Sequence, residues 1–160
     1  GQRDQGQFGA LAREVEWITG CALLIKMEVI HSVGGLDERF FAYYEETEFC
    51  IRARRAGWTI LHVPPARIWH KISLAAREAS PQVNYYMTRN RLLFLKLVKA
   101  GIVAMIYTLI LEFGFRYMNW FINPRWRSKR QQRYALLRGV LDYCRGNFGK
   151  MDIQESSVSV

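Results

Sequence analysis

Three carboxylates lie within four residues of one another, directly behind an aromatic run at residues 40–44. Glu45, Glu46 and Glu48 open a stretch that is predicted to be a helix ending at Gly57. The positive end of a helix dipole, with its free N–H groups, would keep such side chains ionised. An ionised carboxylate can act as a base. The alternative is a solvated first helical turn, in which Glu48 pairs with Arg52 four residues later.

Further motifs stand on both sides of this acidic cluster. Two motifs, residues 17–26 and 33–41, lie before the cluster. Two others, residues 52–58 and 63–70, lie after it. In their order and spacing, these motifs and the cluster together resemble the family 2 glycosyltransferases over roughly residues 4 to 97. The likeness is strongest to the rhamnosyltransferase-like members that build bacterial surface polysaccharides.

The resemblance implies an α/β fold, namely the C-terminal half of a GT-A (nucleotide-diphospho-sugar transferase) fold followed by basic, apolar C-terminal helices. Residues 1–97 would form the acceptor side of the catalytic domain. Family members carry an Asp-x-Asp metal motif in their first half, and these residues contain no such motif. We therefore expect a fragment that lacks the nucleotide-binding half and is inactive alone. A divalent metal, Mg²⁺ or Mn²⁺, would be held mainly through that missing half.

The activity implied by the resemblance is inverting transfer of a sugar, from a nucleotide-diphosphate donor to a glycan or lipid-linked acceptor, in bacterial cell-surface polysaccharide synthesis. The acidic pair of the family, usually Glu-Asp, falls here on Glu45 and Glu46. Glu46 is therefore the expected general base, and Glu45 would help to orient the acceptor. Glu in place of Asp moves the carboxylate by about an ångström, which leaves open which of the two takes the proton.

By the same resemblance, the expected donor- or acceptor-binding residues are Trp17, Thr19, Gly20, Asp37 and Glu48. Residues 17–25 are predicted to be a buried strand that Gly20 interrupts. A glycine inside a strand marks either a bulge or a close approach of the backbone to another group, such as a sugar. Asp37 follows two glycines and is also expected to cap the next turn.

Residues 58–63 are predicted to be a short strand stopped by Pro64 and Pro65, and residues 67–70 a second extended piece. His70 would then lie at a strand end, where the resemblance implies a contact to the metal or the diphosphate. Neutral imidazole is a good metal ligand, but no second ligand stands nearby in the sequence. The alternative is a hydrogen-bonded structural histidine.

Two more helices are predicted from their end signals. Residues 27–33 form a short helix closed by Gly34. Ser80 and Pro81 begin a helix that runs to about residue 99. Arg89, Asn90 and Arg91 lie on this second helix, and we expect them to pin it against the catalytic part or to meet solvent. A phosphate contact is the alternative.

Residues 98–150 are predicted to be a helical membrane-associating region. Residues 100–111 are uncharged and mostly apolar, but a spanning helix needs about twenty such residues. The mixture of aromatic and basic residues that follows is favoured at a membrane interface. Asn123 and Pro124 should end this helix, and a last one is expected over about residues 128–145. Residues 151–160 are predicted to be a disordered tail.

Charge supports an anionic membrane surface as a partner. Residues 85–150 hold thirteen Lys and Arg but only two Asp and Glu, whereas residues 1–84 hold ten of each kind. We expect a cytoplasmic protein that is peripheral on the inner face of the cell membrane. No recognised nucleic-acid-binding motif occurs, so nucleic acid is not an expected partner. A noncatalytic membrane-surface interaction module is the alternative to the enzyme.

Composition bounds the remaining possibilities. The chain has 160 residues, half of them hydrophobic, as in an ordinary folded domain. Its three cysteines are an odd number without Cys-x-x-Cys spacing, which indicates neither a disulfide framework nor a zinc site. A reducing cytoplasm agrees with this cysteine content.

Overall fold

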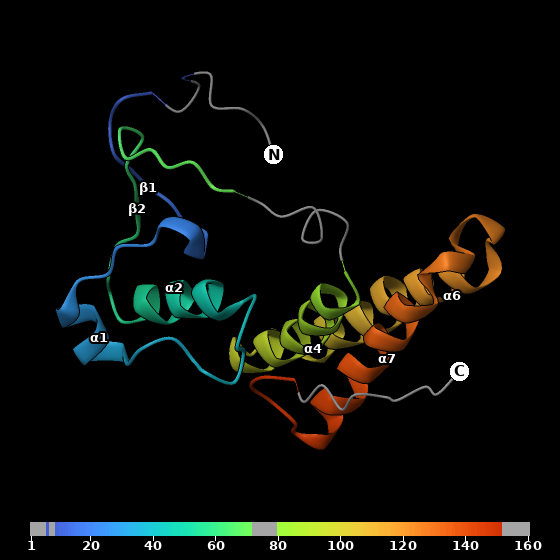
Figure 1. Ribbon diagram of the computed structural model, residues 1–160. Coiled ribbons are helices and arrows are strands. Elements are labelled where there is room, and N and C mark those ends of the chain that lie inside the picture. Colours follow the sequence, from blue (N-terminus) through green and yellow to red (C-terminus); the bar gives the residue numbers. More distant parts are fainter. Residues whose placement is uncertain (1–5, 7–8, 72–79, 152–160) are drawn as a thin grey trace.

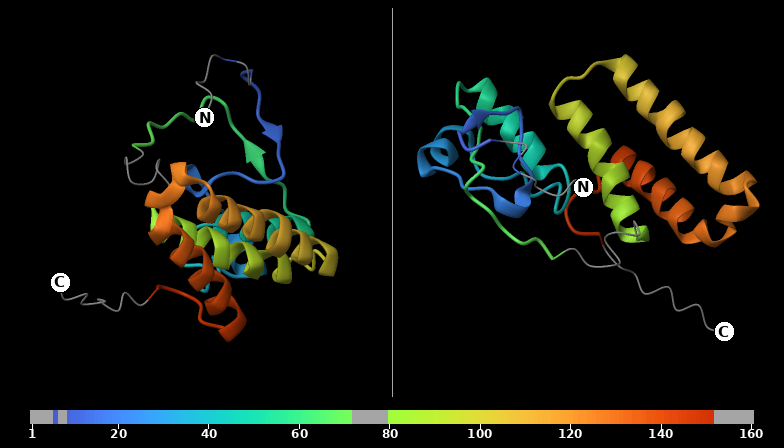
Figure 2. Two further views of the ribbon diagram at one scale, coloured as in Figure 1. Left: turned by 90° about the vertical axis from the view of Figure 1, so that its right-hand side faces the viewer. Right: turned by 90° about the horizontal axis from the view of Figure 1, so that it is seen from above.

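The computed structural model describes residues 6, 9–71 and 80–151. Figures 1 and 2 show the N-terminal elements on one side of the molecule and a group of longer helices on the other. The N-terminal side contains β1 (Arg13–Glu14), the 3-10 turn η1 (Gly20–Ala22), α1 (Met27–Val33), α2 (Glu45–Arg55) and β2 (Leu61–His62). The other side contains α4 (Pro81–Leu97), α5 (Ile102–Tyr107), the π-helical η2 (Thr108–Gly114), α6 (Phe115–Ile122), η3 (Pro124–Lys129) and α7 (Arg130–Arg145).

The two short helices predicted from the sequence around the acidic cluster are confirmed. α1 ends at Gly34, whose φ of 81° is left-handed and whose N–H donates to the carbonyl of Ile30 at 2.8 Å. α2 packs on α1 through a small apolar core of Val29, Phe49 and Ala53. This core fixes the direction of α2 and therefore of the carboxylates at its start.

The predicted strand at residues 17–25 is wrong. Its centre forms η1, and Trp17 is 49% exposed. Among the described residues the only sheet is the antiparallel pair of β1 and β2, in which Arg13 lies opposite His62. Residues 17–25 therefore have no neighbouring strand in the described part of the chain, and a strand needs one to satisfy its backbone groups.

The later strands were also predicted too long. Residues 58–63 supply only the two residues of β2, and residues 67–70 form no strand. The described residues are therefore mostly helical with one small sheet. Of the β-structure expected for the predicted α/β fold, they contain only that sheet.

The predicted helix at residue 81 begins as expected. The Ser80 hydroxyl accepts a hydrogen bond from the backbone N–H of Val83 at 3.3 Å, and Pro81 occupies the first turn of α4. α4 packs along α7 through an apolar cluster of Tyr85, Tyr86 and Ala135. A second cluster joins both helices to η2 and contains Leu92, Phe113 and Leu136. These clusters form the main core of the longer helices.

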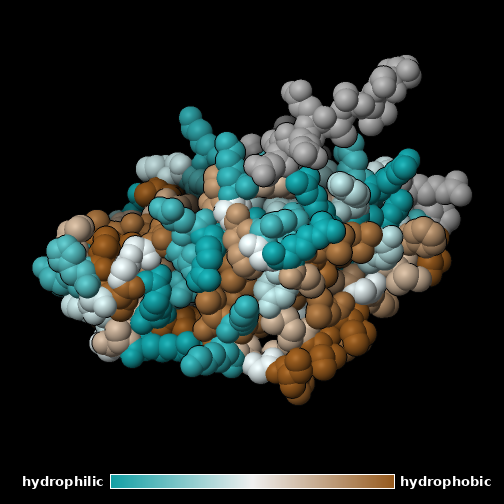
Figure 3. Space-filling model, turned by 90° about the horizontal axis from the view of Figure 1, so that it is seen from below, coloured by the Kyte–Doolittle hydropathy of each residue, from teal (hydrophilic) through white to brown (hydrophobic). Residues whose placement is uncertain are grey.

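α5, η2 and α6 follow one another without a break and end before Asn123 and Pro124, as predicted. Apolar side chains of this run are exposed, with Ile102 at 71%, Phe115 at 72% and Ile122 at 69%. Figure 3 shows hydrophobic surface at the lower right of the molecule. Within the described ranges, no helix is both long enough and apolar enough to cross a membrane. Residues 152–160, most of the predicted tail, lie outside the described residues.

Candidate functional site

The loop in front of α2 has an unusual backbone. Phe41, Tyr43 and Tyr44 have φ values of 63°, 68° and 75°, in the left-handed region that non-glycine residues seldom adopt. Three such residues within four positions are stable only when their surroundings hold them. Tyr44 is also the N-cap of α2. This loop therefore sets the position of Glu45 and Glu46, which follow it directly.

Glu45 and Glu46 each have one carboxylate oxygen, Oε2, that is buried without a hydrogen-bond partner among the described residues. Burial raises the pKa of Glu45, and the neighbouring charge of Glu46 adds to this shift. A buried acceptor without a donor is unfavourable. The pair therefore holds two acceptor oxygens that lack a donor within the described residues.

The segment around η1 lies against the same turn of α2. A Cβ placed on Gly20 would be 3.6 Å from Cβ of Glu46, and the backbone of Ile18 contacts the thiol of Cys50 one turn further along. Gly20 is thus at ordinary van der Waals distance from Glu46, and its predicted approach to a sugar stays a prediction. Trp17 and Thr19 belong to this segment and are exposed beside it. Their contact with a sugar stays a prediction.

Glu48 is engaged elsewhere. Arg52 donates to both of its oxygens, with Nη2 to Oε2 at 2.8 Å, which confirms the pairing expected from their spacing. The Arg52 guanidinium also donates to the carbonyls of Val33 and Gly35 at the end of α1. Glu48 thereby helps to hold α1 and α2 together, and its predicted contact with a sugar remains untested.

Asp37 caps a turn, as expected. Its Oδ1 accepts from the backbone N–H of Arg39 at 3.0 Å, and its Oδ2 lies 2.6 Å from Nη2 of the same residue. The side-chain hydrogen bonds of Arg39 hold the pKa of Asp37 below its ordinary value. The structure therefore gives Asp37 a local role, and its predicted contact with a sugar is not tested by it.

His70 is exposed in a stretch without regular secondary structure. No group of three or more His, Cys, Asp or Glu side chains that could hold a metal ion occurs within residues 9–71 and 80–151. The described residues therefore do not build a metal site, and a metal contact by His70 stays a prediction.

Two buried side chains of α4 donate hydrogen bonds to the loop in front of α2. Arg89 and Asn90 are 1% and 0% exposed, and Asn90 donates to the carbonyl of Phe40 at 2.8 Å. The structure confirms that these two side chains pin α4, here against residues 39–43, and the catalytic role of that loop stays a prediction. The available signal was their position among the apolar residues of α4, where an arginine and an asparagine need partners.

Curated proteins resemble the chain over part of its length. It is 40% identical over 58 residues to N-acetylglucosaminyl-diphospho-decaprenol L-rhamnosyltransferase of Mycobacterium tuberculosis (strain ATCC 25618 / H37Rv), a match covering 36% of this chain and 19% of the relative. It is 37% identical over 83 residues to the low-salt glycan biosynthesis hexosyltransferase Agl10 of Haloferax volcanii, which covers 51% of this chain and 27% of the relative. No protein-family model and no solved structure matches.

Part of the chain is therefore similar to glycosyltransferases. Both relatives are named as glycosyltransferases. The match spans about a fifth of the length of the rhamnosyltransferase and about a quarter of that of the hexosyltransferase. A carboxylate oxygen without a hydrogen-bond donor is chemically suited to accept the proton of a hydroxyl group. Glu45 and Glu46 are the described residues with this property on α2.

The raised pKa of Glu45 predicts a stability effect with a definite sign. Folding favours the protonated form of the Glu45 side chain. The side chain therefore stabilises the fold fully below its pKa in the unfolded chain, about 4.3. This stabilisation is lost as the pH rises through the higher pKa of the folded protein. We expect Glu45→Gln to be more stable than the wild type at pH 7, with the difference shrinking toward pH 4. Urea unfolding of the full-length protein at both pH values measures this. Glu28→Gln, an exposed glutamate of α1, is the control, and an equal effect of pH on all three proteins would contradict the prediction.

Proposed function

We propose that these residues form the acceptor side of an inverting family 2 glycosyltransferase of the GT-A fold, acting in cell-surface polysaccharide synthesis. The observation that carries this proposal is the pair of buried, unpartnered oxygens of Glu45 and Glu46 at the end of a strained loop. The relatives support it, since one is named for transfer of L-rhamnose to N-acetylglucosaminyl-diphospho-decaprenol and the other as a hexosyltransferase of glycan biosynthesis. We therefore propose a lipid-linked glycan as the acceptor and a nucleotide-linked sugar as the donor.

In the proposed reaction, the acceptor hydroxyl oxygen attacks the anomeric carbon of the donor sugar. The bond from that carbon to the nucleoside diphosphate breaks on the opposite face, so the configuration inverts. Glu46 takes the hydroxyl proton, and the nucleoside diphosphate leaves with the electron pair of the broken bond. Glu45 orients the acceptor, and the segment with Trp17, Thr19 and Gly20 borders the site. A divalent metal, Mg²⁺ or Mn²⁺, belongs to the proposal through the resemblance, but no step is assigned to it because the described residues gather no ligands.

The direct test is a transfer assay with the full-length protein. The donors are nucleoside-diphospho-L-rhamnose and a panel of nucleoside-diphospho-hexoses, and the acceptor is N-acetylglucosaminyl-diphospho-polyprenol. Mass spectrometry should find the acceptor heavier by one sugar, and NMR should find the anomeric configuration inverted relative to the donor. Absence of transfer and of donor hydrolysis with every donor would reject the enzyme and favour the noncatalytic membrane module.

We further propose that α5, η2 and α6 lie on the inner face of the cell membrane, as a peripheral attachment. The exposed apolar residues of this run supply a surface that favours the boundary between headgroups and acyl chains. Lys129 and Arg130 follow it within a few residues, and a cation near an anionic surface adds to binding. The combination of an apolar face and neighbouring cations fits an anionic bilayer better than it fits an apolar protein partner.

Charge removal tests this attachment. Lys129→Gln with Arg130→Gln should weaken binding to vesicles of phosphatidylglycerol and phosphatidylcholine roughly thirtyfold, because each charge contributes about 1 kcal/mol near the surface. Sedimentation of vesicles with the full-length protein measures the partition coefficient. The matched control removes two cations from the N-terminal side, Lys26→Gln with Arg54→Gln, both exposed. Equal binding of both double variants and the wild type would remove the basis for a charge-assisted membrane contact.

A further inference from the structure

Two adjacent side chains of α4 reach the strained loop that leads into α2. Nδ2 of Asn90 lies 2.8, 2.6 and 3.0 Å from the carbonyl oxygens of Phe40, Ala42 and Tyr43. One amide group thus meets three backbone acceptors across four residues of the loop. Such convergence of carbonyls requires the backbone to turn sharply, which agrees with the positive φ values of Phe41, Tyr43 and Tyr44.

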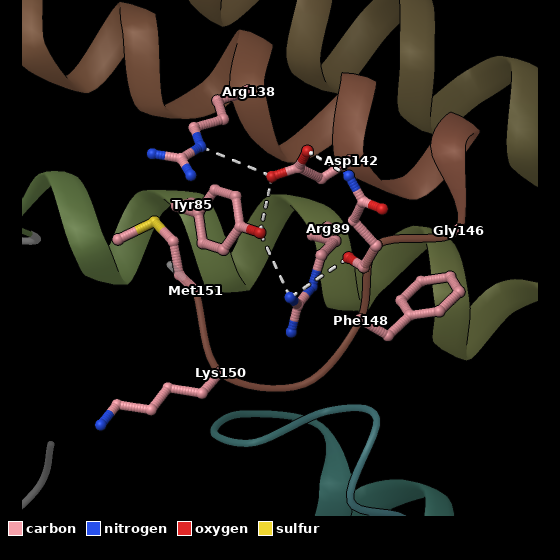
Figure 4. A pocket seen from close by; sticks show the side chains of 9 residues that line it. Tyr85, Arg89, Arg138, Asp142, Gly146, Phe148, Lys150 and Met151 are labelled. Atoms are coloured by element: carbon pink, nitrogen blue, oxygen red, sulfur yellow. Dashed lines mark hydrogen bonds and ion pairs between the residues drawn. The ribbon is translucent and has the colours of Figure 1, made fainter. Parts of the chain in front are cut away.

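Arg89 extends this contact in two directions. Its Nη2 donates to the carbonyls of Arg39 and Phe40 at 3.2 and 3.1 Å, and its Nε donates to Oδ1 of Asn90 at 3.0 Å. Its Nη1 donates to the carbonyl of Gly149 at 2.8 Å, in the segment that follows α7. The guanidinium therefore joins the loop, Asn90 and the segment after α7. Figure 4 shows Arg89 between Tyr85 and this segment.

The surroundings leave the guanidinium little freedom to move. The rings of Tyr85, Tyr86 and Phe148 lie 5.2, 5.1 and 6.0 Å from its Cζ, and the Tyr85 hydroxyl donates to Asp142 at 2.8 Å while accepting from Arg89. Tyr85, Arg89, Asp142 and Phe148 line a pocket of about 380 Å³ (Figure 4). A buried cation is stable only when its donors are satisfied. Here they are satisfied by backbone carbonyls, by Oδ1 of Asn90 and by the Tyr85 hydroxyl. The network therefore favours a single loop conformation.

A backbone hydrogen bond also joins the loop directly to the segment after α7. The backbone N–H of Gly149 donates to the carbonyl of Arg39 at 2.8 Å, and the N–H of Met151 donates to the hydroxyl of Tyr86 at 2.8 Å. The loop before α2 is thus held between α4 and a segment more than a hundred residues further along the chain. Neither contact involves the carboxylates themselves.

We propose that Arg89 and Asn90 are positioning residues for the transfer reaction, and that they act by holding residues 39–44 in the conformation that aims Glu45 and Glu46 at the acceptor. This inference rests on the proposed function. The physical reason is that left-handed backbone is unfavourable for residues other than glycine, so the loop would relax if its carbonyls lost these donors. Relaxation would turn Tyr44, the N-cap of α2, and move the carboxylates that follow it.

Kinetics of the full-length protein give the first test, with a nucleoside-diphospho-L-rhamnose donor and an N-acetylglucosaminyl-diphospho-polyprenol acceptor. Arg89→Lys keeps the charge but loses the planar fork, and Asn90→Asp keeps the size but loses both donors. We expect kcat to fall about 10- to 100-fold in each variant, since displacement by about an ångström costs up to about 100-fold, with KM for the donor within about twofold. Arg133→Lys is the matched control, because Arg133 also donates to a backbone carbonyl, that of Trp120 at 2.7 Å. Its kcat should stay within about twofold.

Hydrogen exchange separates positioning from loss of fold and does not depend on activity. In Arg89→Lys and Asn90→Asp, amides of residues 40–48 should exchange faster, while those of α7 keep their wild-type rates. Wild-type exchange at residues 40–48, or unchanged kcat, would overturn the proposal. Faster exchange throughout α4 and α7 would also overturn it, because the variants would then have lost the helix packing. If the wild type transfers no sugar, the proposed function fails, and the exchange result alone decides whether these residues hold the loop.

Discussion

Glu46→Gln should reduce the turnover of the full-length enzyme by about 10² to 10⁴, the usual contribution of a general base. Gln keeps the size of the side chain but cannot accept a proton, and the Glu46 Oε2 that it replaces has no partner among the described residues. Binding of the donor should be nearly unchanged, because the loss is confined to proton transfer. The measurement is kcat and donor KM in the rhamnosyl transfer assay.

Two further variants decide which carboxylate acts. Glu45→Gln should lower kcat less than Glu46→Gln does, since Glu45 orients the acceptor in the proposed reaction. Glu28→Gln removes a first-turn glutamate from α1 instead of α2 and should leave turnover unchanged. Retained turnover in Glu46→Gln would reject Glu46 as the base, and a larger loss in Glu45→Gln would assign the proton to Glu45.

The sequence predicted those elements whose signals are local. Gly34 after an apolar helix, Ser80 before Pro81, and Pro124 after Asn123 each act within a few residues, and the helix ends lie close to where they were expected. The ion pair of Glu48 with Arg52 is local as well, because residues four apart meet on one face of a helix.

What the sequence did not predict depends on contacts between distant residues. An apolar run such as residues 17–25 is a strand only if another strand pairs with it, and the described residues contain no such neighbour. Likewise, no local pattern shows that Asn90 meets the carbonyls of Phe40 and Ala42, nearly fifty residues away. The acidic pair was found because its residues are adjacent, whereas the groups that hold it in place are not.

Gly139→Ala should destabilise the full-length protein by about 1–3 kcal/mol, the usual cost of overpacking. At an exposed position in a helix, the same change would stabilise the protein by roughly 1 kcal/mol. The sign of the change in stability therefore depends on how closely residue 139 is packed. A Cβ at residue 139 would lie 2.9 Å from the carbonyl oxygen of Tyr85, 3.0 Å from Cβ of Thr88 and 3.2 Å from the backbone nitrogen of Arg89. Two of these three are backbone atoms, which move only if α4 and α7 separate.

Chemical denaturation of the full-length protein measures this loss, with Gly35→Ala as the control because a Cβ there would meet nothing within 4 Å. The control should change stability by less than about 0.5 kcal/mol. Separation of the helices would also move Tyr85 and Arg89, which lie at the point of contact and lead to the loop before α2. Gly139→Ala should therefore speed amide exchange in α4 and α7 as well as in residues 40–48, unlike Arg89→Lys. A Gly139→Ala protein as stable as the wild type would show that α4 and α7 have room for a methyl group at residue 139.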